Sequence, residues 1–174
     1  MNTLKGNTVT LRALEPEDLK FLFETENNES FWSVSHTQTP FSKFLLKQYL
    51  ENAHLDIFEA KQLRLIIEEN LNNQPIGMID LFDFNPQHKR AGIGILIAEK
   101  YQKNGFASEA LQLLINYSFT HLNLHQLYAN ITENNTKSIA LFKKHFFTQI
   151  GTKKDWTFSN GKYKNELIFQ LINE

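Results

Sequence analysis

One segment of the sequence, residues 91–98, is apolar on both faces when it is read as a β-strand. A strand of this kind is expected in the middle of a sheet, where both of its faces are covered. A helical pattern follows at 107–119, with apolar residues spaced so that they form one face of an amphipathic helix. The two segments together predict a mixed α/β sheet in which residues 91–98 lie near the centre.

The other segments arrange strands and helices around this centre. Alternating residues at 8–14 predict a first strand, and helical patterns follow it from Pro16 to Phe23 and from Pro40 to about Phe58. Residues 27–39 lack periodicity and are expected to form a loop. Further strands are predicted at 63–68, 76–84, 126–131, 147–158 and 163–171, and a further helix at 136–144. This order predicts a single domain over residues 1–174, with about seven strands and about four helices, that is neither doubly wound nor a barrel.

Composition excludes several classes of function. Hydrophobic residues make up 41% of the 174 residues and charged residues 21%, which excludes wholesale disorder. The formal net charge of −1 argues against a nucleic-acid partner. The absence of cysteine excludes disulfides and thiolate sites, and the six histidines show no ligand spacing, so no metal is expected. There is no apolar run of membrane length and no secretory signal at the N-terminus, which predicts a cytoplasmic protein without a membrane partner.

The connection between residues 91–98 and 107–119 carries the main functional signal. It reads Tyr101-Gln102-Lys103-Asn104-Gly105-Phe106-Ala107-Ser108. A tight loop that opens a helix points backbone N–H groups and the positive end of the helix dipole at one spot, which suits a phosphate or pyrophosphate. Gly105 lets the backbone approach such a group closely, and Lys103 can add a cation. The loop is neither a P-loop nor a dinucleotide fingerprint, and an ordinary strand–helix connection is the alternative.

The motif Gln102-x-x-Gly105-x-Ala107, placed after a strand and at the start of a helix, resembles the Gln/Arg-x-x-Gly-x-Gly/Ala motif of the GNAT family of N-acetyltransferases. The order of elements matches that family over residues 8–171, and residues 133–142 resemble its Asn-x-x-Ala/Ser segment. Residues 79–81 and 88–91 are similar to the branch that holds spermidine and ribosomal-protein N-terminal acetyltransferases. The resemblance implies the GNAT fold, with a mixed, mostly antiparallel sheet, and acetyl-CoA as co-substrate.

The resemblance also implies how this chain contacts acetyl-CoA. Backbone amides of the loop would bind the pyrophosphate, and the main chain of the preceding strand would pair with the pantetheine arm. Asn135 would hydrogen-bond to the same arm, although a plain helix N-cap is its alternative role. The expected cofactor contacts are Ile95, Leu96, Ile97, Gln102, Lys103, Asn104, Gly105, Phe106, Ala107 and Asn135.

Acetyl transfer needs a neutral amine, so a base removes its proton and an acid meets the departing thiolate. Asp80 and Asp83 fall where polyamine-acetylating relatives carry acids, and Asp80 is the first candidate for binding or deprotonating the amine. A solvated strand position is the alternative for Asp80. Strand alternation puts the two acids on opposite faces unless a bulge intervenes. Relatives use a Tyr hydroxyl as the acid where this chain has Phe142, so His145 is a candidate catalytic replacement and Tyr128 a further one.

The acceptor side in this family is built by the loop between the first two helices and by the last hairpin. Acidic and aromatic side chains at those places can form a pocket for a cationic amine. They are Glu26, Glu29, Trp32, His36, Asp155 and Trp156. Of these, Glu29 and Trp32 are predicted substrate contacts, together with Asp83, and a surface or packing role is the alternative for each.

These observations predict an acetyl-CoA-dependent N-acetyltransferase that acts on a primary amine by direct transfer in a ternary complex, because no cysteine is present to carry an acetyl group. The acceptor is a polyamine or other small amine, or a protein or peptide N-terminus. A catalytically impaired acyl-CoA-binding module is the first alternative, motivated by Phe142 and Phe146. A purely structural role without acyl-CoA is the second. The outer strand of the last hairpin can support a homodimer.

Overall fold

The computed structural model describes residues 2–174 and contains one seven-stranded sheet in the order β1-β2-β3-β4-β5-β7-β6. Every neighbouring pair is antiparallel except β4 and β5, which are parallel. The predicted mixed, mostly antiparallel sheet is therefore confirmed, and residues 91–97 of the strand predicted at 91–98 lie in its central strand. The strands are β1 (Val9–Arg12), β2 (Leu63–Glu69), β3 (Gln74–Asn85), β4 (Arg90–Ile97), β5 (Gln126–Thr132), β6 (Thr148–Ser159) and β7 (Lys162–Ile172).

Residues 2–174 form six α-helices, two more than predicted. They are α1 (Leu19–Glu26), α2 (Trp32–Ser35), α3 (Lys43–Glu51), α4 (Ile57–Ala60), α5 (Phe106–Thr120) and α6 (Thr136–Lys144). Single 3-10 turns lie at Asn2–Leu4, Pro16–Asp18, Glu29–Phe31 and Glu99–Tyr101. Of the helices that the structure describes, none has the length and apolarity of a membrane span.

The two additional helices are short. The segment predicted as one helix at 40–58 is two helices, because α3 ends at Glu51 and α4 has its own N-cap: the carboxylate of Asp56 accepts from the N–H groups of Phe58 and Glu59. The helix α2 lies inside residues 27–39, which were predicted as a loop. A helix of four residues is too short to show a periodic pattern in the sequence.

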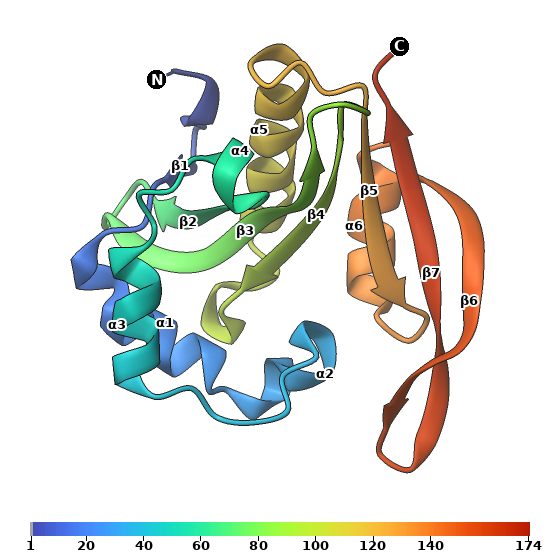
Figure 1. The fold of residues 1–174 in the computed structure, drawn as a ribbon, viewed down its shortest axis with the longest axis horizontal. Helices are drawn as coiled ribbons and strands as arrows, with labels where there is room; N and C mark the ends of the chain where they lie inside the picture. The colour runs from blue at the N-terminus through green and yellow to red at the C-terminus, as the bar shows by residue number, and fades with distance from the viewer. Residues whose placement is uncertain (1) are drawn as a thin grey trace.

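The helices cover both faces of the sheet (Figure 1). Leu65 and Ile67 of β2 belong to the large buried cluster that includes Leu111 of α5, whereas Ile66 belongs to a smaller cluster with Leu22 of α1. Successive residues of a strand point to opposite faces, so α5 and α1 lie on opposite sides. The alternation in burial therefore fixes which face of the sheet each helix covers.

The two halves of the sheet separate in the middle. The strands β4 and β5 pair only over residues 90–92 and 126–128. Beyond that point β4 stays paired with β3 as far as Ile97, and β5 stays paired with β7 as far as Thr132. Figure 1 shows the two strands diverging toward α2. Residues 93–97 consequently have no strand partner on the β5 side within residues 2–174, which leaves backbone N–H and C=O groups along that edge.

A bulge in β3 separates the two acids of that strand. The register with β4 shifts between Phe82 and Asn85, and Asp83 has a φ of 48° in the left-handed region. Asp80 is half-buried and lies opposite Gly94, whereas Asp83 is exposed. The bulge that would break the strand alternation between Asp80 and Asp83 is therefore present.

Glu109 ties the first turn of α5 to the start of β1. Its carboxylate accepts hydrogen bonds from the backbone N–H groups of Asn7 at 2.8 Å, Thr8 at 2.8 Å and Val9 at 2.9 Å, and from the Thr8 hydroxyl at 2.5 Å. Partial burial raises the pKa of Glu109, but these hydrogen bonds outweigh it and hold the pKa below its ordinary value. The ionised carboxylate therefore stabilises the fold.

Glu109→Gln is expected to lower the free energy of unfolding by about 2 kcal/mol at neutral pH, because hydrogen bonds to a charged acceptor are lost. A depressed folded pKa contributes stability above the ordinary carboxyl pKa, and that contribution is lost as the pH falls through the folded value. Urea unfolding at neutral pH and at about pH 3 should therefore show the difference from wild type shrinking in acid. Glu24→Gln, on the exposed face of α1, is the control. An unchanged difference at both pH values would contradict the role of the charge.

Candidate functional site

A cleft of about 500 Å³ opens where β4 and β5 separate. Its walls are residues 93–96 of β4 and 129–132 of β5, and Asn135, Ser138 and Phe142 of the α6 segment close it on one side. The opposite side is lined by charged and polar groups from the sheet, the α1–α2 region and the last hairpin. These are Glu26, His36, Arg64, Asp80, Lys153 and Glu166. The cleft therefore connects a strand edge with a cluster of charges.

The loop from Gln102 to Ala107 is held in shape by its own side chains. The Gln102 side-chain amide donates to the Ile97 carbonyl at 3.0 Å, and the Asn104 amide donates to the carbonyls of Tyr101 and Gln102 at 3.3 and 3.2 Å. Gly105 is the N-cap of α5 with a φ of 80°, and a Cβ built there meets no atom within 4 Å. The loop thus presents its backbone to open space at the N-terminus of a 15-residue helix, as an anion site requires.

The edge of β4 next to this loop lines the cleft. Ile95 and Leu96 are among the lining residues, and Ile97 is buried immediately behind the loop. Their main chain is paired with β3 on one side only, so their other edge faces β5 across the cleft. An extended ligand can pair with such an edge as a strand would.

Asn135 caps a helix and also lies at the cleft. Its side-chain oxygen accepts from the Ser138 N–H at 3.3 Å and caps α6. It also lines the cleft. The N-cap reading is confirmed, and a contact with a ligand in the cleft stays a prediction.

Asp80 is part of a three-residue ion cluster at the floor of the cleft. Arg64 donates to both carboxylate oxygens of Asp80 at 2.8 Å and to Glu26 at 2.6 Å. Burial alone would lower the pKa of Arg64, but the hydrogen bond and charge of Asp80 raise it above its ordinary value. The guanidinium also lies 5.8 Å from the centre of the Tyr49 ring. Asp80 therefore faces the cleft as a carboxylate held by a permanent cation, and not as an isolated acid.

Asp83 and Tyr128 do not line the cleft. Tyr128 donates its hydroxyl to the Asp83 carboxylate at 3.0 Å. Burial and then the Asp83 hydrogen bond raise the pKa of Tyr128 to about 12. The structure does not bring either side chain to the other candidate residues, so this geometry gives no support to Asp83 as a substrate contact or to Tyr128 as an acid.

Phe142 and His145 of the α6 segment point to different places. Phe142 is 3% exposed, lines the cleft and packs edge-on against Phe147 with ring centres 5.0 Å apart. The two ring nitrogens of His145 instead lie 2.8 Å from Ser108 Oγ and 3.0 Å from Gln112 Oε1, both on α5. The amide oxygen only accepts, so Nδ1 donates to it and Nε2 accepts from the serine.

His145 is therefore a contact between helices. Its burial, and after it the charge of Lys144, lower the pKa of His145, which keeps the ring neutral. It is absent from the residues that line the cleft. The catalytic role predicted for His145 has no support in this geometry, because its ring faces α5 from the C-cap of α6. The observed role of His145 is instead to join α6 to α5.

Glu29 and Trp32 line a second hollow of about 650 Å³ beside the cleft. This hollow lies between the α2 segment and the tip of the last hairpin, and it contains Phe158 and Lys164. The Trp32 indole donates to the Glu26 carbonyl at 2.9 Å, which fixes the α2 segment to the end of α1. His36 lines both the cleft and the hollow, whereas Asp155 lines neither.

Three charged residues of the cleft were missed by the sequence analysis, namely Arg64, Lys153 and Glu166. Glu166 is 4% exposed, and it directly precedes the apolar run from Leu167 to Phe169. A single acid at the edge of an apolar run was the only signal for it. Within residues 2–174 no three His, Asp or Glu side chains gather as metal ligands.

Comparison with known proteins is consistent across sequence and structure. The Acetyltransferase (GNAT) domain family matches residues 8–148. The spermidine N(1)-acetyltransferase of Escherichia coli (strain K12) is 32% identical over 171 residues, which cover 95% of this chain and 88% of that protein.

Two solved structures of the Vibrio cholerae spermidine N-acetyltransferase are similar to this fold. One, in complex with CoA and spermine, has a TM-score of 0.86 and 30% identity, with 96% of each chain covered. The other is a dodecameric structure in an intermediate state, with a TM-score of 0.80 and 31% identity, covering 96% of this chain and 95% of that one.

Proposed function

Because this chain belongs to the GNAT family of acetyltransferases and is an acetyl-CoA-dependent N-acetyltransferase, we propose that its acceptor is a polyamine of the spermidine type. The observation that carries the proposal is the cleft, whose β4 wall is followed in the chain by the loop at the start of α5 and whose opposite side carries a group of carboxylates. We further propose that residues 1–174 form one acetyltransferase domain and that the enzyme is cytoplasmic.

Acetyl-CoA is held in this proposal by main-chain groups. The N–H groups of residues 103–107 bind the pyrophosphate at the N-terminus of α5, whereas the Gln102 N–H already donates to the Glu99 carbonyl at 3.2 Å. The free edge of residues 95–97 pairs with the pantetheine arm, and Asn135 donates to that arm from the start of α6. The thioester then lies near the middle of β4, where Asp80 is paired with Gly94. The ammonium first loses a proton to a base, for which Asp80 or solvent is the candidate. The neutral amine then attacks the thioester carbonyl, the C–N bond forms and the C–S bond breaks, coenzyme A leaves as the thiolate, and the remaining nitrogen proton is released to solvent.

The acceptor side suits an elongated cation. Glu26 and Asp80 share one arginine, so the cluster keeps a net negative charge toward the cleft. Asp80 remains our candidate for binding the amine, and Arg64 holds both of its carboxylate oxygens. Glu29 and Trp32 remain proposals for the far end of the acceptor, because their hollow adjoins the cleft at His36. A polyamine carries a second ammonium group for this far end of the site, whereas a monoamine does not.

Thiol release from acetyl-CoA tests the acceptor class. We expect kcat/KM for spermidine to exceed that for a monoamine by at least about tenfold, equal to about 1.4 kcal/mol of transition-state binding. A peptide with a free N-terminus serves as the competing acceptor class. Preference for the peptide, with spermidine inert, would overturn the polyamine proposal and favour an N-terminal acetyltransferase.

Self-association is part of the same proposal. The relative from Vibrio cholerae with a dodecameric structure argues for an assembly larger than the predicted homodimer. The strand β6 forms one edge of the sheet and carries exposed Ile150 and Phe158, which supports a contact between copies there. Sedimentation of the pure protein gives the number of subunits.

A further inference from the structure

Glu166 is a buried carboxylate in the acceptor part of the cleft. It lies on β7, opposite Thr132 of β5 on one side and Lys153 of β6 on the other. Its side chain is buried between these strands, and its two oxygens point toward basic side chains. Oε1 lies 3.2 Å from Lys153 Nζ, and Oε2 lies 3.8 Å from His36 Nε2. A carboxylate that is removed from water in this way requires a positive partner.

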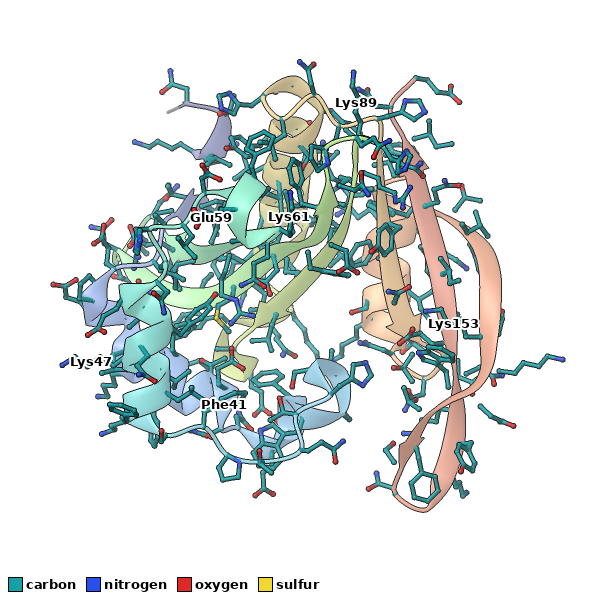
Figure 2. The ribbon with its side chains drawn as sticks, viewed as in Figure 1. Phe41, Lys47, Glu59, Lys61, Lys89 and Lys153 are labelled. Carbon is teal, nitrogen blue, oxygen red and sulfur yellow. The ribbon has the colours of Figure 1, made fainter. Side chains whose placement is uncertain are left out.

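Lys153 supplies that partner from within the cleft. Its ammonium group lies 4.6 Å from the centre of the Trp156 ring as well as beside Glu166. The lysine side chain remains 32% exposed, whereas the Glu166 side chain is 6% exposed. Figure 2 labels Lys153 on the hairpin that borders the cleft. The carboxylate is therefore enclosed, whereas the lysine side chain still reaches solvent.

A carboxylate and an aromatic face that contact the same ammonium group form a typical recognition site for a cationic amine. The group that occupies it is a primary ammonium at the end of four methylene groups. This is also the chemical form of one end of an alkyl polyamine. The protein thus holds, in its own acceptor cleft, the type of cation that the acceptor presents.

We propose that Glu166 and Trp156 bind an alkylammonium group of the acceptor, and that Lys153 occupies this site until the acceptor displaces it. The proposal rests on the proposed function and adds a subsite to it. Displacement exchanges one ammonium for another at Glu166, and the exposed stem of Lys153 carries its charge into solvent. Lys153 is then a built-in competitor that weakens acceptor binding without contacting the thioester.

Lys153→Met tests the competitor, because methionine keeps the unbranched stem and removes the charge. We expect the KM for spermidine to fall about three- to tenfold with kcat and the KM for acetyl-CoA unchanged, the size of effect that one partly exposed cation on a carboxylate and an aromatic ring gives. Glu166→Gln is expected to raise the spermidine KM about tenfold. Lys154→Met, at the exposed neighbouring lysine, is the control and should change neither constant.

Two results would overturn this inference. An unchanged or raised spermidine KM in Lys153→Met would show that Lys153 does not compete with the acceptor. An unchanged KM in well-folded Glu166→Gln would reduce the pair to a structural ion pair. If Glu166→Gln does not fold, the lysine variant alone decides.

Failure of the polyamine proposal is detected separately. Calorimetric titration of n-butylammonium into wild type and Lys153→Met, with acetyl-CoA present, probes the site without turnover. Tighter binding to the variant supports the alkylammonium site even if spermidine is not the acceptor. Equal binding to both proteins contradicts it.

Discussion

Gly105→Glu is expected to abolish acetyl-CoA binding, raising the Kd by at least about 100-fold. The new carboxylate would lie at the N-terminus of α5, where the pyrophosphate is proposed to bind. Two like charges about 4 Å apart repel by about 4 kcal/mol at the effective dielectric of a protein surface, which is enough for this loss. A Cβ at Gly105 meets no protein atom within 4 Å, so the side chain projects into the space that the ligand needs.

The hairpin turn offers a matched control for this variant. Gly161 also has a left-handed φ, 73° against 80° at Gly105, and a Cβ there likewise meets nothing within 4 Å. Gly161→Glu therefore carries the same backbone strain and the same change of charge, away from the loop. Calorimetric titration of acetyl-CoA into both variants should show binding only to Gly161→Glu. Equal affinities would place the cofactor elsewhere, and absence of binding to well-folded wild type would leave a shared fold without the expected ligand.

Phe142→Tyr is expected to raise kcat about 10- to 100-fold. A general acid contributes about 10²- to 10⁴-fold in typical enzymes, and the lower range applies because a thiolate is a tolerable leaving group. Phe142 lines the cleft, so a hydroxyl on its ring would lie on the side where the departing sulfur is proposed to lie. The KM for acetyl-CoA should stay nearly constant, since the new group acts on the transition state.

Phe147→Tyr is the control for the added hydroxyl. Phe147 is the edge-on partner of Phe142, is equally buried and does not line the cleft. Steady-state kinetics of both variants should show the gain only in Phe142→Tyr. A kcat that stays at the wild-type value would mean that solvent or another group already protonates the thiolate. Tight acetyl-CoA binding with no turnover in wild type, restored by Phe142→Tyr, would favour the impaired-module alternative.

Local patterns predicted the regular elements of the fold well. The helix predicted at 136–144 has the same bounds as α6, and the apolar strand at 91–98 is the central strand of the sheet. The errors lie where an element is too short for a period to appear, as at α2, or where a polar cap divides one apolar pattern into two helices, as at Asp56. Caps and single turns depend on a few residues and leave little trace in a window of periodicity.

The site residues likewise divide into those that a local motif identifies and those that only the fold brings together. The loop around Gly105 and the cap at Asn135 are contiguous in sequence, so a motif identifies them. Glu166 and Lys153 reach the cleft only because β7 pairs with β5 and β6 pairs with β7, and such long-range pairing is not visible in local spacing. The catalytic role predicted for His145 lacks support for a related reason. A helical offset of three residues from Phe142 does not fix direction at the end of a helix, where the contacts with α5 decide it.

The short pairing between β4 and β5 affects how firmly the two halves of the sheet are held together. Three residue pairs hold the two half-sheets together along this line, and the ligand proposed to lie beside them spans the rest of the gap. Free energy of binding then adds to the free energy of unfolding by mass action, so co-substrate concentration sets how firmly the halves are joined. In the proposed complex the co-substrate completes the sheet, and the two halves are less tightly joined each time coenzyme A departs.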